Sequence, residues 1–118
     1  MAVLKEAYQQ TFTVPSTSGS YAPERIAFGE VAAGQAPQAF EGVTASVDTT
    51  VASCVIELWL PKVGIAGGAH INTDYSYSGK SIAATGGETW ALAGYPGAQI
   101  RVKSGGTSGS AVVSATAF

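Results

Sequence analysis

The sequence has few charged residues and few of the residue types that carry metal, redox or acid–base chemistry. It contains one cysteine and one histidine, and Asp, Glu, Lys and Arg together make up 12% of its 118 residues. That charged fraction is about half of the average for globular proteins. One cysteine and one histidine on different segments cannot supply the ligands of a zinc site. A lone Cys54 cannot form an internal disulfide either, so we expect the chain to be made and folded in a reducing cytoplasm.

Long apolar runs and concentrations of positive charge are also missing. No stretch approaches the roughly 18 consecutive apolar residues that a membrane-spanning helix needs. Residues Met1 to Val14 lack the basic segment and apolar run of a secretory signal peptide. The net charge of −2 argues against non-specific nucleic-acid binding, and the densest basic spot, Arg101 and Lys103, fits a solvated strand face. We therefore expect neither a membrane nor a nucleic acid as a partner.

What the chain does have is apolar residues and small residues. Hydrophobic residues make up 46% of the sequence, enough for the core of one domain, and Gly, Ala, Ser and Thr fill the charge deficit. Disordered chains are highly charged and poor in apolar residues, so this composition predicts a folded domain. A charge-poor surface suits a protein packed against others, because interface cores are depleted in charge. A soluble β protein coated with Ser and Thr has the same composition, so both interpretations stay open.

Short apolar runs separated by clusters of Gly, Pro, Ser, Asn and Asp predict an all-β fold. We expect a single antiparallel β-sandwich over residues 1–118, jelly-roll-like or, alternatively, of immunoglobulin-like topology. No segment is convincingly helical. The expected strands, roughly eight or nine in number, are Tyr8 to Val14, Arg25 to Val31, Ala39 to Val47, Val51 to Leu60, Lys80 to Ala84, Thr89 to Ala93, Ala98 to Ser104 and Ser110 to Phe118, with His70 to Tyr77 as either a short strand or an ordered loop.

The most hydrophobic segment, Val51 to Leu60, predicts a central strand. Its alternation places Cys54, Ile56 and Leu58 on one face and Glu57 and Trp59 on the other. Proline has no N–H to donate to a neighbouring strand, so the strand is expected to end at Pro61. Breaks are also expected at the turn Asp48 to Thr50 and the flexible loop Gly64 to Gly68.

The two ends of the chain each leave two interpretations open. Residues 1–14 are either an edge strand or an extended N-terminal arm that swings on a hinge at Pro15 to Ser20 and adds a strand to a neighbour. Tyr8 and Phe12 then become candidates for contacts between subunits. The last strand carries small side chains that indicate close approach, either to another molecule or across a thin sandwich: Ala111, Val113, Ala115 and Ala117.

No group of residues predicts catalysis or cofactor binding. His70 has Asp74 nearby in sequence, but no Gly-x-Ser-x-Gly segment provides a nucleophile. Cys54 on an apolar strand face is expected to behave as a small hydrophobe. Ser104 to Ser110 lacks the Lys-Ser/Thr ending and following helix of a phosphate loop, so it predicts a hairpin turn. We expect no catalytic residue, no cofactor and no metal.

Glu57 and Trp59 are the nearest approach to a sugar-handling site. A carboxylate beside an aromatic ring is able to contact a sugar, but glycoside cleavage needs two facing carboxylates. Possible partners for Glu57 are Glu30, Glu41 and Glu88, and nothing in the sequence fixes their spacing. An exposed or subunit-facing sheet surface is the simpler explanation.

Aromatic side chains supply the candidate interface. Trp90, in Thr-Trp-Ala-Leu, is expected in the core, whereas Trp59, Tyr75 and Tyr77 are expected at an interface, where large amphipathic side chains give contact area. Tyr95 is a further member of this aromatic set.

The segment from Thr89 to Ala115 carries a resemblance to a known group of proteins. It holds a Trp-x-Leu strand, a Tyr-Pro-Gly corner, an Ile-Arg-Val-Lys strand and a Gly-Gly-Thr-Ser-Gly turn into a Ser-Ala-Val-Val-Ser strand. Val51 to Leu60 fits the central strand of the same style. In these features the chain resembles small β-sandwich virion proteins of tailed bacteriophages, most closely a capsid decoration (cement) protein.

The resemblance implies a non-enzymatic structural protein that binds the outside of the phage capsid and stabilises it. Its partner is then the major capsid protein, and it forms a homo-oligomer, with a trimer favoured. It is made in the host cytoplasm and resides on the capsid surface of the virion. The alternative is a receptor- or glycan-binding module of a head fibre or tail protein, which would stack sugars on Trp59, Tyr75 or Tyr77. A glycoside-cleaving enzyme is a third class.

Overall fold

The computed structural model describes residues 6–29, 40–50, 52–66, 69–83, 86–91 and 97–118. These residues form eight strands and no helix, which confirms the predicted all-β class. The strands are β1 (Glu6–Val14), β2 (Ile26–Phe28), β3 (Gly42–Thr50), β4 (Cys54–Ala66), β5 (Ala69–Ala83), β6 (Gly87–Ala91), β7 (Ala98–Ser104) and β8 (Gly109–Ala117).

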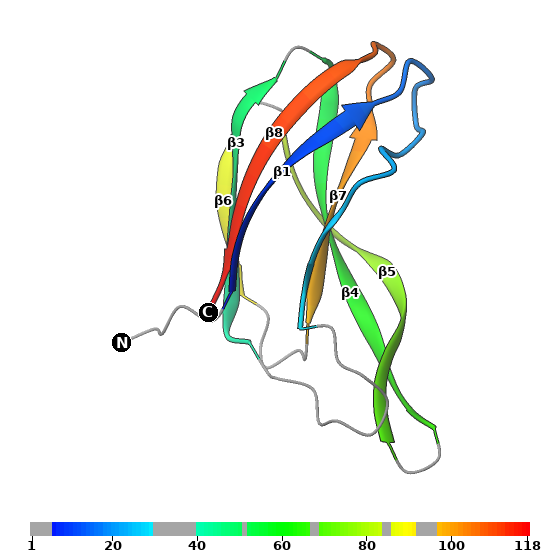
Figure 1. Ribbon diagram of the computed structural model, residues 1–118, viewed down its shortest axis with the longest axis vertical. Helices are drawn as coiled ribbons and strands as arrows, with labels where there is room; N and C mark the ends of the chain where they lie inside the picture. Colours follow the sequence, from blue (N-terminus) through cyan, green and yellow to red (C-terminus); the bar gives the residue numbers. More distant parts are fainter. Residues whose placement is uncertain (1–5, 30–39, 51, 67–68, 84–85, 92–96) are drawn as a thin grey trace.

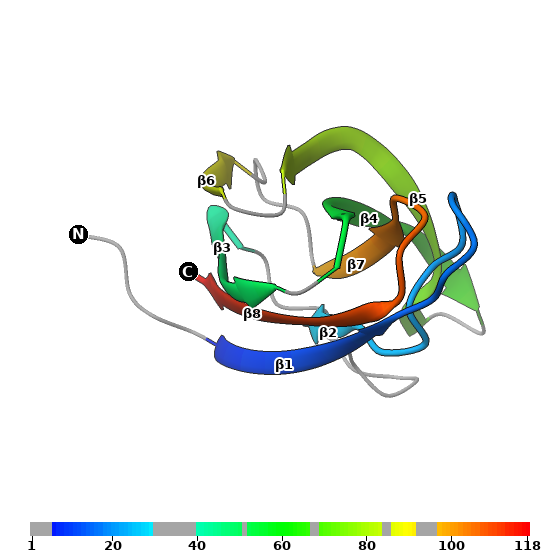
Figure 2. The same cartoon turned by 90° about the horizontal axis from the view of Figure 1, so that it is seen from above.

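The strands form two antiparallel sheets that pack face to face (Figures 1 and 2). Sheet A has the order β1-β8-β3-β6, and sheet B has the order β2-β7-β4-β5. Successive strands lie in opposite sheets except for the β4–β5 hairpin. This is the order of a jelly roll, in which two Greek keys are wound together. An immunoglobulin-like domain has a different division of its strands between the two sheets, so that alternative does not hold.

The core lies between the two sheets and follows the predicted alternation. In β4 the inward Ile56 and Leu58 are fully buried, and in β7 the inward Ile100 and Val102 are too. Burying one such aliphatic side chain stabilises the fold by about 1.5–3 kcal/mol. Much of the remaining core volume is occupied by the rings of Phe12, Phe28 and Phe40, by Val14, Val43 and Trp90, and by Cys54 at one end.

The small side chains of β8 belong to this core. Ala111, Val113, Ala115 and Ala117 are all 2% exposed or less. Strand β8 lies in the middle of sheet A, between β1 and β3, and its inward face points at sheet B. Their small size therefore reflects close approach inside the sandwich, and they offer no surface to another molecule.

Strand β1 is an edge strand that pairs with β8 along its whole length. The register runs from Glu6 opposite Ala117 to Val14 opposite Gly109. Residues 6–14 thus lie in the chain's own sheet, which leaves residues 1–5, outside the described part, for the arm interpretation.

The predicted turn at Asp48 to Thr50 is wrong, because β3 continues through it with a β-bulge. The register with β8 shifts between Val47 and Thr49. The Asp48 carboxylate accepts hydrogen bonds from Gln9 of β1, at 2.8 Å, and from Ser114 of β8. These bonds, Ser114 first, hold the pKa of Asp48 below its ordinary value. A bulge leaves one residue without a direct cross-strand partner, and here its side chain bonds across the sheet.

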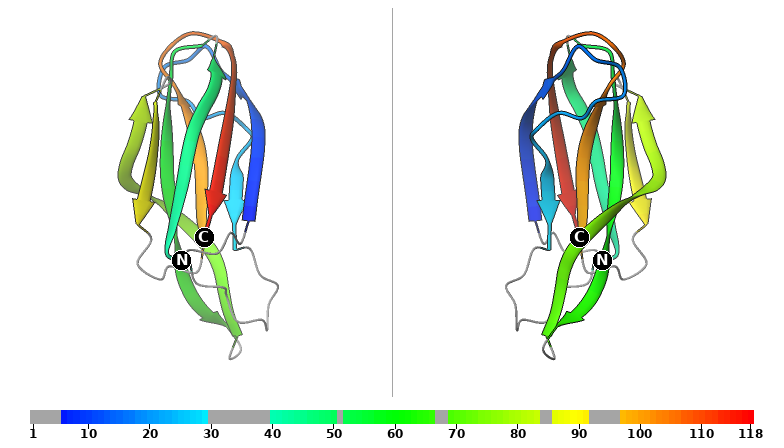
Figure 3. Two further views of the ribbon diagram at one scale, coloured as in Figure 1. Left: turned by 90° about the vertical axis from the view of Figure 1, so that its left-hand side faces the viewer. Right: turned by 90° about the vertical axis from the view of Figure 1, so that its right-hand side faces the viewer.

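The β4–β5 hairpin is much longer than the sequence indicated. Strand β4 pairs with β7 only from Cys54 to Trp59 and then continues to Ala66, paired with β5 alone. Figure 3 shows this two-stranded ribbon extending past the ends of the neighbouring strands. Pro61 does not end the strand, because it lies beyond the last pairing with β7 and no second neighbour needs its missing N–H.

The ribbon also includes segments that the sequence predicted as separate strands and loops. Gly64 to Ala66 is strand, which corrects the predicted loop Gly64 to Gly68 over its described part. Residues His70 to Tyr77, expected as either a short strand or an ordered loop, and the short strand expected at Lys80 to Ala84 form one continuous strand, β5, as far as Ala83. A bulge between Leu58 and Trp59 interrupts the β4–β5 register without ending either strand.

The loop between β1 and β2 runs along the free edge of β7. Gly19 N–H donates to the carbonyl of Ser104 at 2.9 Å, Ser104 N–H donates to the carbonyl of Ser20 at 2.8 Å, and Ala22 N–H donates to the carbonyl of Val102 at 2.9 Å. The segment therefore continues the line of β2 as an irregular edge of sheet B. It carries Tyr21 onto the outer side of that sheet, beside Lys103.

Candidate binding surface

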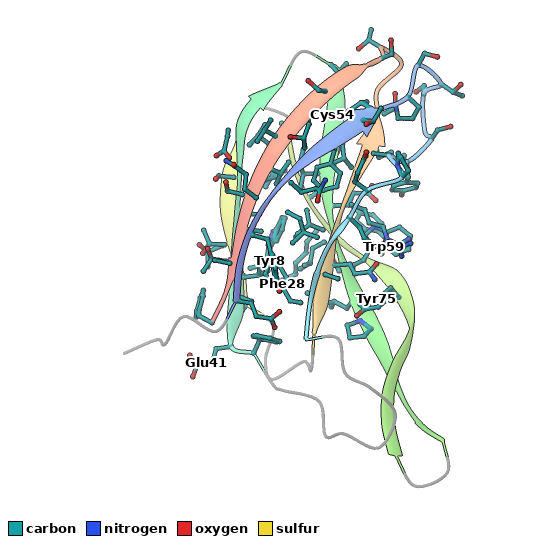
Figure 4. All side chains as sticks on the ribbon, viewed as in Figure 1. Tyr8, Phe28, Glu41, Cys54, Trp59 and Tyr75 are labelled. Carbon is teal, nitrogen blue, oxygen red and sulfur yellow. The ribbon has the colours of Figure 1, made fainter. Side chains whose placement is uncertain are left out.

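The outer side of sheet B carries a group of aromatic and polar side chains that we call the aromatic face. Alternation along β4 and β7 turns these side chains away from the core, and Figure 4 shows Trp59 and Tyr75 on the side of sheet B that faces away from sheet A. The aromatic face consists of Tyr21 from the β1–β2 loop, Glu57 and Trp59 from β4, Tyr75 and Tyr77 from β5, and Gln99 and Arg101 from β7.

Trp59 is the centre of this surface. The guanidinium carbon of Arg101 lies 4.1 Å from the centroid of its ring. The ring of Tyr77 lies 6.0 Å away at an interplanar angle of 38°, and the ring of Tyr21 meets it edge-on at 5.6 Å and 86°. Because β7 and β5 flank β4 on opposite sides, Arg101 and Tyr77 enclose Trp59 between them. Each such cation–π or aromatic contact contributes about 0.5–1.5 kcal/mol.

Glu57 lies beneath the rings and organises them. Only 3% of this residue is exposed, although it is on the outer side of the sheet. Its Oε1 accepts hydrogen bonds from the Tyr21 hydroxyl at 2.7 Å and from Trp59 Nε1–H at 3.1 Å. A buried carboxylate is costly without such donors. Burial, followed by the hydrogen bond to Glu57 and its negative charge, raises the pKa of Tyr21 to about 12, so Tyr21 remains a donor at neutral pH.

Gln99 holds Arg101 in place on Trp59. Gln99 is 3% exposed, and its Oε1 accepts hydrogen bonds from Arg101 Nε at 3.0 Å and from Arg101 Nη2 at 2.8 Å. Burial lowers the pKa of Arg101, and the positive charge of Arg25 lowers it further. The guanidinium remains charged at neutral pH, because the ordinary pKa of arginine is too high for the group to lose its proton in a protein.

The described side chains of the aromatic face offer aromatic rings, hydrogen-bonding groups and one cation. The Glu57 carboxylate is covered and bound by Tyr21 and Trp59. Glu41 precedes β3 at one end of sheet A, far from Trp59 in Figure 4. Glu30 and the side chain of Glu88 lie outside what the structure describes. Among the described residues, no three or more His, Cys, Asp or Glu side chains are grouped as metal ligands would be.

Three of the five predicted interface residues, Trp59, Tyr75 and Tyr77, share the aromatic face. Tyr8 lies elsewhere, on edge strand β1. It is 48% exposed, its ring lies 5.5 Å from that of Phe28, and its hydroxyl donates to Glu6 at 3.0 Å (Figure 4). Phe12 is 0% exposed, which corrects its assignment to an interface, because its ring belongs to the core between the two sheets.

Sequence reasoning missed Tyr21, Gln99 and Arg101 as members of this surface. The alternation of Arg101 with the buried Ile100 and Val102 does carry a signal, because it places the arginine outward next to β4. Tyr21 gives no comparable signal, since its position depends on the hydrogen bonds that hold the β1–β2 loop against β7.

The remaining candidates have structural roles. Trp90 is 3% exposed and Cys54 is 6% exposed, so both are core residues as predicted. The hairpin turn predicted at Ser104 to Ser110 is wrong, because β7 and β8 lie in different sheets and the segment between them crosses from sheet B to sheet A. This connection is fixed to the β3–β4 connection, because Gly105 N–H donates to the Ser53 carbonyl at 2.8 Å. His70 and Asp74 lie on β5 in the protruding ribbon, and Tyr95 lies outside the described residues.

No protein-family model matches the chain, and no curated protein sequence matches it. Nowhere in the described part of the chain is there a helix with the length and apolar character needed to cross a membrane.

Proposed function

We propose that the chain is a non-enzymatic structural protein of a bacteriophage virion, which binds the outer surface of the capsid as a decoration (cement) protein. In this proposal the aromatic face docks onto the major capsid protein. The observation that carries the proposal is the ordered row Tyr77–Trp59–Arg101 with Tyr21 at its edge, displayed on one outer sheet of a chain with only 12% charged residues.

The composition of the row supports a protein partner. Tyr, Trp and Arg are the residues most enriched among those that dominate binding energy at protein interfaces. Tyr21 is 37% exposed and Tyr77 is 43% exposed, so both present ring surface that a partner can cover. Glu57 already fixes Tyr21 and Trp59, and Gln99 fixes Arg101, which reduces the conformational entropy lost on binding.

The mechanism in this proposal is a clamp. A protein that binds only the assembled lattice stabilises that lattice by mass action. A symmetric oligomer, with a trimer favoured, places several aromatic faces on neighbouring capsomers at once, and simultaneous engagement raises the overall affinity well above that of one face. The proposed location is therefore the capsid surface of the virion, after synthesis in the host cytoplasm.

The second candidate is a glycan-binding module of a head fibre or tail protein. It is supported by the exposed rings of Tyr21 and Tyr77 on either side of Arg101, which resemble a platform with a polar centre. Trp59 itself is a poor sugar platform, because the Arg101 guanidinium lies over its ring, 4.1 Å from the centroid. This is why we favour a protein partner over a sugar.

The test uses empty capsids assembled from the major capsid protein encoded in the same genome, and measures co-sedimentation of the purified chain. We expect Tyr77→Ala to weaken binding at least about tenfold, as loss of an interface hot spot does. Tyr8→Ala is the matched control, because Tyr8 is similarly exposed but lies on the other sheet. Equal binding by Tyr77→Ala and the unmodified chain would contradict the proposal. Glycan binding that Tyr77→Ala abolishes, with no capsid binding, would favour the second candidate.

A further inference from the structure

A hollow lies beside the aromatic face, where the β1–β2 loop passes the edge of β7. Its volume is about 200 Å³, and it is lined by Tyr21, Ala22, Pro23, Glu24, Arg25 and Arg101. Arg101 thus belongs to both features, because its guanidinium lies over Trp59 and the residue also lines this hollow. The hollow is continuous with the surface that the proposed function assigns to docking.

Two arginines, Arg25 and Arg101, line this hollow. Among the residues that the structure describes, neither Arg25 nor Arg101 has an acidic oxygen within ion-pair distance. Arg101 donates to Gln99 through Nε and Nη2, which leaves the Nη1 end of its five-donor fork without a partner within the described residues. Arg25 is exposed on the loop just before β2. Burial, followed by the positive charge of Arg25, lowers the pKa of Arg101.

The two nearby carboxylates are already engaged elsewhere. Glu24 lines the hollow, but its Oε1 accepts from the backbone N–H of Thr13 at 2.7 Å and its Oε2 accepts from the Thr13 hydroxyl at 2.8 Å. Burial acts to raise the pKa of Glu24, but the Thr13 hydrogen bonds outweigh it and lower the pKa, so Glu24 is ionised at neutral pH. Glu57 is bound by Tyr21 and Trp59. Both carboxylates therefore hold the surface together and leave the open donors of Arg101 and Arg25 for a ligand.

We propose that this hollow is a carboxylate-binding subsite that receives an Asp or Glu side chain of the protein on which the aromatic face docks. The planar guanidinium of Arg101 is held at a fixed orientation, and such a fork matches the two oxygens of a carboxylate. Arg25 also lines the hollow and supplies a second positive charge. Tyr21 and Pro23, two further lining residues, offer apolar surface to the methylene groups of the incoming side chain. This inference rests on the proposed function, because it names the chemistry of the partner at the same surface.

The test is a titration of the isotope-labelled chain with a hexaglutamate peptide at constant ionic strength, followed by the NMR resonances of the Arg101 Nε–H and of the residue 21–25 amides. We expect saturable shifts, and no shifts with a hexaglutamine peptide. Arg25→Gln should weaken binding at least about fivefold, as expected for loss of a charge-assisted contact. Lys103→Gln is the matched control, because it removes one positive charge from the outer side of β7 and Lys103 does not line the hollow. It should change the affinity less than about twofold, since a solvent-exposed charge contributes little.

Three results would overturn the inference. The first is the absence of saturable shifts, and the second is tighter binding of inorganic phosphate than of the peptide. The third is equal weakening by Arg25→Gln and Lys103→Gln, which would indicate general charge attraction. Capsid co-sedimentation separates this inference from the proposed function. Peptide binding without capsid binding retains the subsite and removes the capsid, whereas capsid binding that Arg25→Gln leaves unchanged retains the capsid and removes the subsite.

Discussion

Glu57 and Arg101 occupy directly opposed positions on β4 and β7, yet each is hydrogen-bonded to neutral partners. Glu57 accepts from Tyr21 and Trp59, and Arg101 donates to Gln99. The opposite charges lie side by side, and the neutral groups fix where each one points. This division leaves the arginine fork open toward solvent while the carboxylate is covered. The aromatic face therefore depends on its neutral hydrogen-bonding groups as much as on its charges.

The first prediction concerns the hydroxyl of Tyr21. Tyr21→Phe removes one of the two donors to a carboxylate that is only 3% exposed. We expect this to lower the free energy of unfolding by about 1–2 kcal/mol, the typical effect of leaving a buried acceptor with a missing bond. Urea denaturation followed by tryptophan fluorescence measures it. Tyr8→Phe removes an equivalent hydroxyl whose bond to Glu6 is exposed, and it should cost less than about 0.5 kcal/mol. Equal effects of the two variants would show that Glu57 does not need Tyr21.

The second prediction concerns the dependence of stability on pH. Folding raises the pKa of Tyr21 from its ordinary 10.0 to about 12, so the folded state retains this proton more tightly than the unfolded state. The stabilisation it provides is fully present below pH 10 and is lost as the pH rises through 12. The free energy of unfolding, measured across this window for the unmodified chain and for Tyr21→Phe, should converge as the pH rises. Parallel curves would contradict the raised pKa.

The third prediction concerns a close backbone contact between the β7–β8 turn and the β3–β4 connection. A Cβ at Gly105 would lie 2.3 Å from the Ser53 hydroxyl and 3.1 Å from the Ser53 carbonyl oxygen. The side chain of Ser53 is able to rotate away, but the carbonyl is held by the N–H of Gly105 itself. Gly105→Ala should therefore lower the free energy of unfolding by about 1–3 kcal/mol, as overpacking does.

Gly86→Ala is the control for that substitution. A Cβ at Gly86 would find its nearest neighbour, the Ala83 carbonyl oxygen, at 3.4 Å, which is ordinary contact. Thermal unfolding of both variants should show a lower midpoint for Gly105→Ala alone. A Gly105→Ala midpoint that matches the unmodified chain would mean that the two connections separate easily and that their hydrogen bond contributes little.

The strands of this fold were largely predictable, because alternation is a local property. The bounds of β7 follow directly from alternating Ile100 and Val102, and the outward position of Trp59 follows from the buried Ile56 and Leu58. The turn predicted at Asp48 and the end predicted at Pro61 failed for one shared reason. Asp48 lies at a bulge in the pairing with β8, and Pro61 lies past the last pairing with β7, so each outcome depends on where a distant strand pairs.

The aromatic face was only half predictable for the same reason. Trp59, Tyr75 and Tyr77 lie on adjacent strands of a hairpin, so their proximity is nearly local. Tyr21 reaches them only because the β1–β2 loop lies along β7, and Phe12 is hidden only because sheet B covers it. The arrangement of the two sheets determines both the position of Tyr21 and the burial of Phe12. Alternation within one strand does not reveal that arrangement.

The central position of β8 has a consequence for how the protein reaches its folded state. This strand is the last of the eight along the chain, yet it fills the slot between β1 and β3 and supplies part of the core from Ala111 to Ala117. During synthesis, sheet A has a gap in its middle until β8 has left the ribosome. We therefore expect folding to wait for β8 and to be slow, in the range of about milliseconds to seconds typical of sheets with long-range pairing. A ribosome stalled within the last strand would hold a chain whose β1 has no partner, with its edge open to other molecules.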